Sequence, residues 1–259
     1  MNKSLLGGIA IAILGLALGL YFDGGKVGQM LQPTAALIVF GGTLGSVLVQ
    51  FPFSVVMQAA KQLKMVFVSV EDPASGLLED IMRYALRARR NGLVSLDPEL
   101  EHVTDPFLKR AMTLAIDGTH SAELRQTMEL EMDLEAETED MVPKVYEAAG
   151  GFAPTIGILG AVIGLIQVMQ RLQNIEEVGK GIAVAFVATI YGVGSANIFF
   201  LPFAGRVKML MQRKQVLREL MLVGVISLVE RTNPMVLEAQ LAAYLSKPDA
   251  AARRKMVAR

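Results

Sequence analysis

Residues 148–169, which read AAGGFAPTIGILGAVIGLIQVM, decide the fold because they are long, apolar and free of ionisable side chains. A helix rises about 1.5 Å per residue and the hydrocarbon core of a bilayer is about 30 Å thick, so about 20 apolar residues can cross it. Residues 4–22, 34–51 and 181–203 pass the same test. The sequence therefore predicts an all-α, polytopic membrane protein with four transmembrane helices.

The composition supports a membrane protein and excludes several other classes. Hydrophobic residues make up 53% of the 259, the formal net charge is zero, and there is no cysteine. Disulfides and thiol chemistry are therefore excluded, and the charge balance indicates no nucleic-acid partner. The two histidines, His102 and His120, are too isolated for a metal site. With no nucleophile–base set and no phosphate loop, we expect neither an enzyme nor a bound cofactor.

The four spans divide the chain into four predicted parts. Residues 1–52 form a first transmembrane hairpin, although the basic and then apolar start also resembles a secretory signal. Residues 53–147 form a large helical loop, with helices expected at 53–70, 74–91, 106–117 and 121–142, the last strongly acidic. Residues 148–203 form a second hairpin, and residues 204–259 form a helix, expected at 206–231, and a basic tail. The apolar patch at 221–229 is too short to be a fifth span.

The short turns on one side of the membrane are nearly neutral, whereas basic residues are concentrated beside the spans on the other side. They are Lys3, Lys61, Lys64, Arg206, Lys208, Arg213 and Lys214. Loops rich in Lys and Arg stay in the cytoplasm. We therefore expect both termini and the large loop to be cytoplasmic.

The spans lack any Asp, Glu, Lys, Arg or His at membrane depth, which an ion path normally requires. Either the protein moves no ions, or another chain supplies the protonatable group. Small residues recur about every four positions in the third and fourth spans, and such strips allow close helix packing. They are Ala149, Ala153, Gly157 and Ala161, then Gly181, Ala185, Ala188, Gly192 and Ala196. The strips serve either packing within the chain or contact with a partner.

Two threonines within the spans have two possible roles. Thr155 and Thr189 could simply bond to their own helix backbone. Alternatively, they could order water beside a partner's carboxylate. Pro154, directly before Thr155, frees backbone carbonyls at that level and favours the second role.

The third and fourth spans resemble the MotA family of flagellar stator subunits, part of the MotA/TolQ/ExbB superfamily. The motifs are GFAPTIGILGAVIGL at 151–165, AFVATIYG at 185–192, Pro202 after the fourth span, and Gly41-Gly42-Thr43 in the second. The resemblance extends over essentially the whole chain.

The resemblance implies an ion channel that converts ion-motive force into torque on the rotor. Five MotA-like chains would surround two MotB-like chains, whose single span supplies an Asp and whose periplasmic domain binds peptidoglycan. Thr155 and Thr189 match channel-lining threonines, while Pro154 and Pro202 match prolines that couple ion passage to shape change. Sodium-driven members tend to have Thr at the position of Ala161, so the resemblance favours protons.

The resemblance also implies rotor-contacting charges in the large loop. Arg89 and Asp97 fall on the family's Arg and Glu positions eight residues apart, with Asp replacing the usual Glu, and Arg90 lies beside them. Arg83 and Arg87 could join in. These charges would act on the rotor protein FliG. The alternative is a solvated basic helix end favoured by the helix dipole.

Two other functions remain open on the sequence. A TolQ- or ExbB-type proton-channel subunit also pairs with an Asp-bearing helix, but has three spans where this chain has four. A membrane scaffold without ion flow would not explain the Pro-Thr pair of the third span or the threonine of the fourth.

Overall fold

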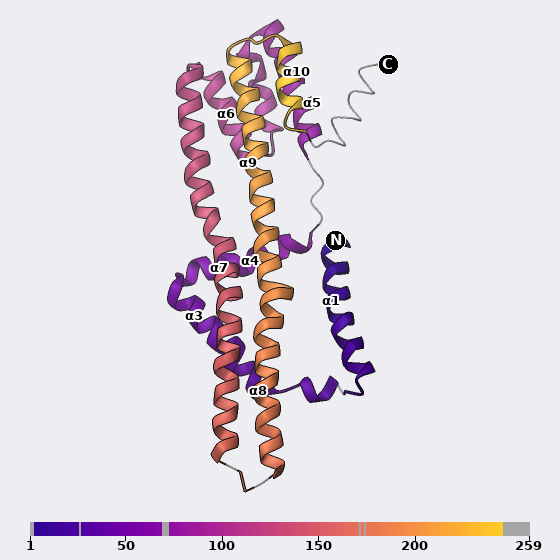
Figure 1. Cartoon of the computed structure of the whole chain (residues 1–259). Helices are drawn as coiled ribbons and strands as arrows, with labels where there is room; N and C mark the ends of the chain where they lie inside the picture. The colour runs from indigo at the N-terminus through magenta and orange to yellow at the C-terminus, as the bar shows by residue number, and fades with distance from the viewer. Residues whose placement is uncertain (1–2, 26, 69–72, 171, 174, 246–259) are drawn as a thin grey trace. The chain divides into compact units, whose positions relative to one another are not determined.

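The computed structural model describes residues 3–25, 27–68, 73–170, 172–173 and 175–245, and these residues form helices without any strand (Figure 1). The chain divides into two compact units. We call Met1–Ser69 with Asp140–Met209 the span unit, and Val70–Glu139 with Leu210–Arg259 the loop unit. The predicted basic tail beyond residue 245 lies outside the described residues.

The span unit contains the membrane-crossing helices. Four helices in the described ranges are long and apolar enough to cross a bilayer. The elements of the span unit are α1 (Lys3–Phe22), η1 (Val27–Met30), α2 (Pro33–Ala36), the π-turn η2 (Leu37–Gly41), α3 (Gly42–Gln50), α4 (Phe53–Phe67), the second part of α7 (Ser121–Gln170), α8 (Ile175–Ser195), the π-turn η4 (Ala196–Phe200) and the start of α9 (Leu201–Val229). The predicted all-α fold with four spans is confirmed.

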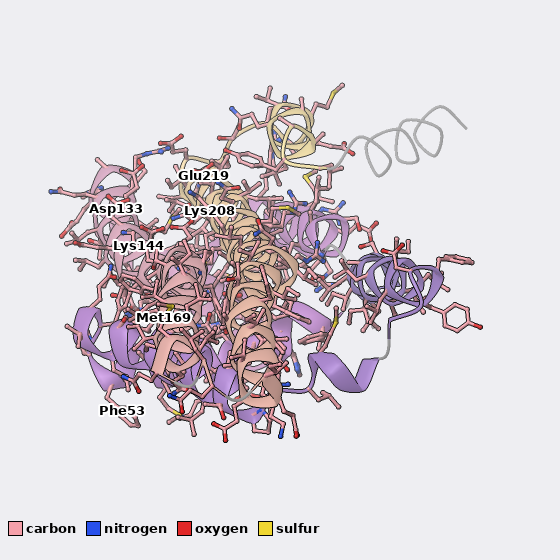
Figure 2. All side chains as sticks on the ribbon, turned by 60° about the horizontal axis from the view of Figure 1, so that its bottom comes forward. Phe53, Asp133, Lys144, Met169, Lys208 and Glu219 are labelled. Carbon is pink, nitrogen blue, oxygen red and sulfur yellow. The ribbon has the colours of Figure 1, made fainter. Side chains whose placement is uncertain are left out.

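Helix α1 differs from the other spans because none of its residues from Ser4 to Phe22 is buried. Helix α4 follows the second span after Pro52, as expected, and its two lysines, Lys61 and Lys64, are exposed. Phe53, at its start, is 67% exposed and projects outward in Figure 2. These apolar and basic side chains suit a helix at a membrane surface.

The loop unit is a helical bundle with its own core. Its elements are α5 (Ala74–Asn91), η3 (Leu93–Glu101), α6 (Pro106–Ile116), the first part of α7, the rest of α9, and α10 (Pro234–Ala242). Helix α5 has the predicted bounds and ends where Gly92 adopts a φ of +82°, which glycine tolerates. The Asp105 carboxylate caps α6 by accepting from the backbone N–H groups of Phe107 and Leu108.

The apolar patch at 221–229 belongs to this core rather than to a membrane span. Met221, Val225 and Ile226 of α9 are buried in the same cluster as Leu78 and Ile81 of α5. Burial of the patch within the unit agrees with the prediction that it is not a fifth span.

The prediction of separate helices at 121–142 and 148–169 is wrong, because α7 is one helix of 50 residues. Pro143 and Pro154 both lie inside it. A proline removes one backbone hydrogen bond and crowds the preceding turn, but it does not oblige the chain to leave the helix. Around Pro143 the side chains of Val142 and Val145 are buried, and this packing favours continuing the helix.

Candidate functional site

The centre of the site is a close contact between the backbones of α7 and α8. A Cβ on Gly157 would lie 2.9 Å from the Ala188 carbonyl oxygen. A Cβ on Gly192 would lie 2.5 Å from the Ala153 carbonyl oxygen and 3.0 Å from the Gly157 Cα. Distances this short leave no room for any side chain, so both glycines are required for the approach.

The same contact continues toward the turn between the two spans. A Cβ on Gly164 would lie 3.1 Å from the Gly181 carbonyl oxygen and 3.1 Å from the Ala185 Cβ. The small-residue strips therefore face each other within one chain at these positions. Of the two roles left open by the sequence, packing inside the chain is the one found for these glycines, and a partner would have to use other faces of α7 and α8.

The two threonines flank this contact. Thr155 is exposed and donates to the Phe152 carbonyl at 2.8 Å, and Thr189 is half-buried and donates to the Ala185 carbonyl at 3.4 Å. Both therefore make the own-helix bond that the sequence left as one alternative. A hydroxyl that donates in this way keeps lone pairs that can accept a hydrogen bond from water.

Thr155, Thr189 and Ala161 occupy neighbouring levels of the two helices. Thr155 lies two residues before Gly157, and Thr189 directly follows Ala188, which Gly157 contacts. Ala161 directly follows Gly160, whose added Cβ would lie 3.0 Å from the Ala188 Cβ. The half-buried Ala161 thus lies about one helical turn beyond the level of the Gly157 contact.

The two prolines lie near a second contact. A Cβ on Gly150 would lie 2.6 Å from the Leu201 Cδ2 atom. Pro202 directly follows Leu201 and is exposed, and Pro154 lies one turn along α7 from Gly150. The π-turn η4 ends immediately before Leu201. Such a turn is one way a helix accommodates an irregular hydrogen-bond pattern.

The three predicted rotor-contacting residues are all exposed in the loop unit. Arg89 and Arg90 lie in the last turn of α5, and Asp97 lies on η3. An ion pair between Arg87 and Glu99 joins α5 to η3. This pair fixes the short segment that carries Asp97 relative to the helix end that carries both arginines.

Arg83 and Arg87, which the sequence placed in the same neighbourhood, have carboxylate partners. Arg83 pairs with Asp80 at 2.8 Å and Arg87 with Glu99. Their charges are therefore partly compensated within the chain. Arg89 and Arg90 present more of their charge to a partner.

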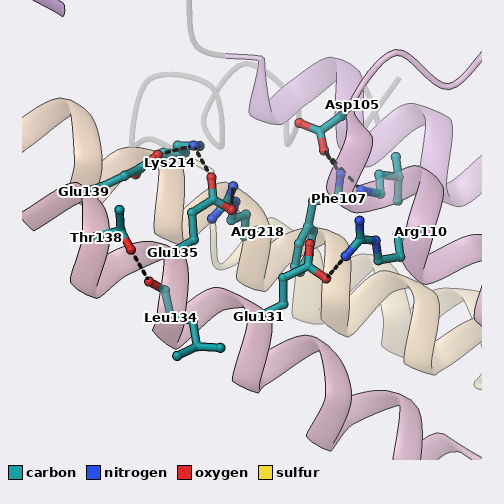
Figure 3. A network of polar contacts seen from close by, with 11 residues as sticks. Asp105, Phe107, Arg110, Glu131, Leu134, Glu135, Thr138, Glu139, Lys214 and Arg218 are labelled. Carbon is teal, nitrogen blue, oxygen red and sulfur yellow. Dashed lines mark hydrogen bonds and ion pairs between the residues drawn. The ribbon is translucent and has the colours of Figure 1, made fainter. Parts of the chain in front are cut away.

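The acidic part of α7 contains an ion-pair network that the sequence did not predict (Figure 3). Glu135 pairs with Lys214 at 2.9 Å and with Arg218 at 2.5 Å, and Lys214 also binds Glu139. The Arg218 guanidinium is 5.4 Å from the centre of the Phe107 ring, and the residue is only 8% exposed. We expected the acidic face of this helix to be solvated, but only part of it is, because some of its carboxylates pair with α9.

The network strongly lowers the pKa of one carboxyl group. The hydrogen bond from Arg218, and then that from Lys214, lowers the pKa of Glu135 to about 2. The carboxylate is thus favoured in the folded state. The sequence contains a possible signal for this network, because α9 has basic residues four apart and α7 has acidic residues four apart. The sequence does not show which residues of two distant helices lie opposite each other, so the pairing could not be predicted.

A Glu135→Gln variant should be less stable than the parent protein at neutral pH, by about 1 kcal/mol because the side chain is partly exposed to solvent. Since the pKa of Glu135 is lowered on folding, its contribution is present above the unfolded pKa of about 4.5 and is lost as pH falls toward about 2. Thermal unfolding of purified protein across this pH range should show the two melting curves converging.

Asp133→Asn is the matched control for this measurement. Asp133 is an exposed acid two residues away on α7, labelled in Figure 2. Its substitution should leave the melting temperature nearly unchanged at every pH. Equal effects of the two substitutions would contradict the role of the network.

Comparisons with known proteins agree with the resemblance seen in the motifs. The profile of the MotA/TolQ/ExbB proton channel family matches residues 99–220, and that of the motility protein A N-terminal region matches residues 6–84. Motility protein A of Bacillus subtilis (strain 168) is 33% identical over 254 residues, which cover 96% of this chain and 93% of the relative. The chain belongs to the motility protein A family.

Solved structures of this family have the same fold. The structure of MotAB from C. jejuni matches with a TM-score of 0.89 at 27% identity, covering 95% of this chain and 97% of that one. The flagellar MotAB stator complex from Bacillus subtilis matches with a TM-score of 0.88 at 32% identity and the same coverage. Membership of the motility protein A family makes this a multi-pass membrane protein.

Proposed function

We propose that this chain is a stator subunit of the flagellar motor, which forms an ion channel with a MotB-like partner and converts ion-motive force into torque. The observation that carries the proposal is the glycine contact between α7 and α8, which brings Thr155 and Thr189 to neighbouring levels. The solved relatives are MotAB complexes, which supports a partner of the MotB type. A TolQ- or ExbB-type role is less well supported, because the motility protein A N-terminal profile also matches.

Because the spans of this chain have no ionisable side chain at membrane depth, the partner must supply the protonatable group. An acidic side chain near Thr155 and Thr189 would be costly to ionise against apolar helices, and protonation would remove that cost. A change in its protonation therefore changes which arrangement of the partner helix and this chain is stable. The threonine hydroxyls would order the water that carries the ion, and Pro154 and Pro202 would allow α7 and α9 to adjust.

The proposed coupling ion is the proton. Ala161 offers no oxygen to replace the hydration shell of a sodium ion, whereas a proton needs only an ordered water and an acceptor. The proposed assembly is five copies of this chain around two partner chains. In the bacterial inner membrane, both termini and the loop unit would face the cytoplasm, because the basic residues beside the spans are concentrated on that side and the turns on the other side are nearly neutral.

Complementation tests this function directly. In a strain that lacks its stators, co-expression of this chain and its MotB-like partner should restore swimming, and either chain alone should not. Swimming speed should follow the pH gradient and remain constant when sodium is replaced by potassium. Speed that follows sodium would contradict the choice of ion, and purification without an Asp-bearing single-span partner would contradict the stator function itself.

The exposed charges of α5 and η3 are proposed to act on the rotor protein FliG. Exposed ion pairs are individually weak, about 0–1 kcal/mol each, so a single substitution of Arg89, Arg90 or Asp97 should slow swimming only slightly. The double change Arg89→Glu with Arg90→Glu should stop it, because it reverses the field at the helix end. Motility in soft agar measures both effects.

A charge reversal elsewhere on the loop unit controls for general effects. Lys109 is exposed on α6, and Lys109→Glu changes the net charge without touching α5 or η3. This variant should swim normally at unchanged protein abundance. Loss of swimming in the control, to the same extent as in the double variant, would contradict a specific rotor contact.

A further inference from the structure

An apolar cavity of about 280 Å³ lies within the span unit, between α3, α4, α7 and η4. Its walls include Val47 of α3, Leu63 of α4, Val145 of α7 and Phe200 of η4. Engineered apolar cavities of about 150 Å³ already bind molecules the size of benzene and stay free of water. A cavity of this size and lining therefore fits several methylene groups.

One polar side chain in the wall lacks a partner. Thr43 lines the cavity, is only 3% exposed, and its hydroxyl makes no hydrogen bond. Tyr146 also lines the cavity, but its hydroxyl donates to the Ala59 carbonyl at 2.7 Å. A buried water needs two to four polar partners, and one free hydroxyl does not supply them. An apolar ligand that carries an acceptor oxygen satisfies both the walls and Thr43.

The rim of the cavity indicates where the ligand comes from. Phe40 and Leu44 line the cavity and are 46% and 54% exposed. Both lie in the second span, between Pro33 and Gln50, where hydrocarbon surrounds the helix. The cavity therefore opens toward the acyl chains of the bilayer rather than toward water.

The charge of α4 indicates the kind of lipid. Leu63 faces the cavity, and Lys64 follows it at about 100° around the helix, on the flank of the opening. Helix α4 carries Lys61 and Lys64 and no acidic residue, and both lysines are exposed. Exposed lysines at a membrane surface attract anionic headgroups.

We propose that this cavity binds one acyl chain of an anionic phospholipid, with an oxygen of the lipid accepting from Thr43 and the phosphate near Lys64. The bound chain fills the space between α4 and the α3–α7 pair. The α7 residues of the site, Val145, Tyr146 and Ala149, precede the part of the helix that makes the glycine contact with α8.

Photolabelling in vesicles tests the site. The full chain, with its copurifying subunits, is reconstituted in phosphatidylethanolamine vesicles that contain a phosphatidylglycerol with a diazirine in one acyl chain. Irradiation and peptide mass spectrometry should locate the label on Val47 and its neighbours in α3 and on Val145 to Ala149 in α7. The same diazirine chain on phosphatidylethanolamine should label these positions several-fold less.

Three substitutions, one of them a control, sharpen the test. Ala60 lines the cavity and is exposed, so Ala60→Phe places a ring in the opening and should lower labelling about tenfold, the equivalent of losing about two buried methylenes. Met65→Phe adds a ring on the opposite, exposed face of α4 and should not change labelling. Thr43→Val keeps the shape but removes the donor, and should lower labelling about threefold, as expected for one lost hydrogen bond.

Several outcomes would overturn the proposal. Unlabelled walls in the unsubstituted protein would mean that protein, such as a second copy of the chain, fills the cavity. Equal labelling of the Ala60→Phe and Met65→Phe variants would place the lipid elsewhere on the spans. Equal labelling by the two lipids would remove the selection for an anionic headgroup.

Discussion

A Gly192→Ala variant should abolish stator-driven swimming and lower the amount of folded protein in the membrane. The added Cβ would lie 2.5 Å from the Ala153 carbonyl oxygen and 3.0 Å from the Gly157 Cα, and both atoms belong to backbone that cannot rotate away. Helices α7 and α8 must therefore separate. Overpacking of this kind costs about 1–3 kcal/mol, and the loss of the close approach adds the packing energy of the neighbouring small residues.

Gly194→Ala is the matched control on the same helix. A Cβ there would have no neighbouring atom within 4 Å, so the substitution adds the same methyl group without a clash. Because alanine favours a helix over glycine by about 1 kcal/mol, this variant should be as stable as the parent or slightly more so. Membrane abundance by immunoblot, thermal stability in detergent and swimming speed give three readouts. Similar losses in both variants would mean that the contact is not what makes Gly192 necessary.

A Thr189→Val variant should assemble normally and fail to swim. Valine has the shape of threonine, so the helix contact is preserved, but the hydroxyl that would order water in the ion path is gone. Loss of the bond to the Ala185 carbonyl alone would cost only about 0.5–1.5 kcal/mol and would not stop the motor. Co-purification with the partner subunit and swimming speed, measured on the same cells, separate assembly from ion passage.

Two further substitutions distinguish the ion path from local packing. Ser195 on the same helix is buried and donates to the Gly192 carbonyl at 3.2 Å, so Ser195→Ala removes only an own-helix bond. It should leave the cells swimming. Thr189→Ser restores a hydroxyl without the methyl group and should recover most of the speed. Full swimming by the Thr189→Val strain would exclude the proposed channel role.

The fold could be predicted from the sequence because length and apolar composition determine what can cross a bilayer. Both ends of helix α5 could also be predicted correctly. Its apolar stripe indicates which face is buried, and Gly92 indicates where the helix ends. The single helix α7 was not predictable, because Pro143 normally indicates a boundary. Val142 and Val145 on either side of this proline are buried, and that packing is seen only in the structure.

The geometry of the candidate site could not be predicted from the sequence. The strips of small residues indicated close packing, but the sequence left open whether their neighbour was in the same chain. That question depends on the register of Gly157 against Gly192, which only the structure gives. The ion pairs of Glu135 and the unpartnered hydroxyl of Thr43 depend in the same way on which helices meet.

The exposure of α1 has a consequence for how the protein responds to its membrane. Since no residue of this span is buried within the chain, its surface is free to contact the hydrocarbon of the bilayer or a neighbouring subunit. Where it meets hydrocarbon, its tilt depends on bilayer thickness, because a span of 19 residues, about 28 Å long, must match the hydrocarbon core or tilt. A thinner or thicker bilayer should therefore change the tilt of α1 while the glycine contact of α7 and α8 stays as it is.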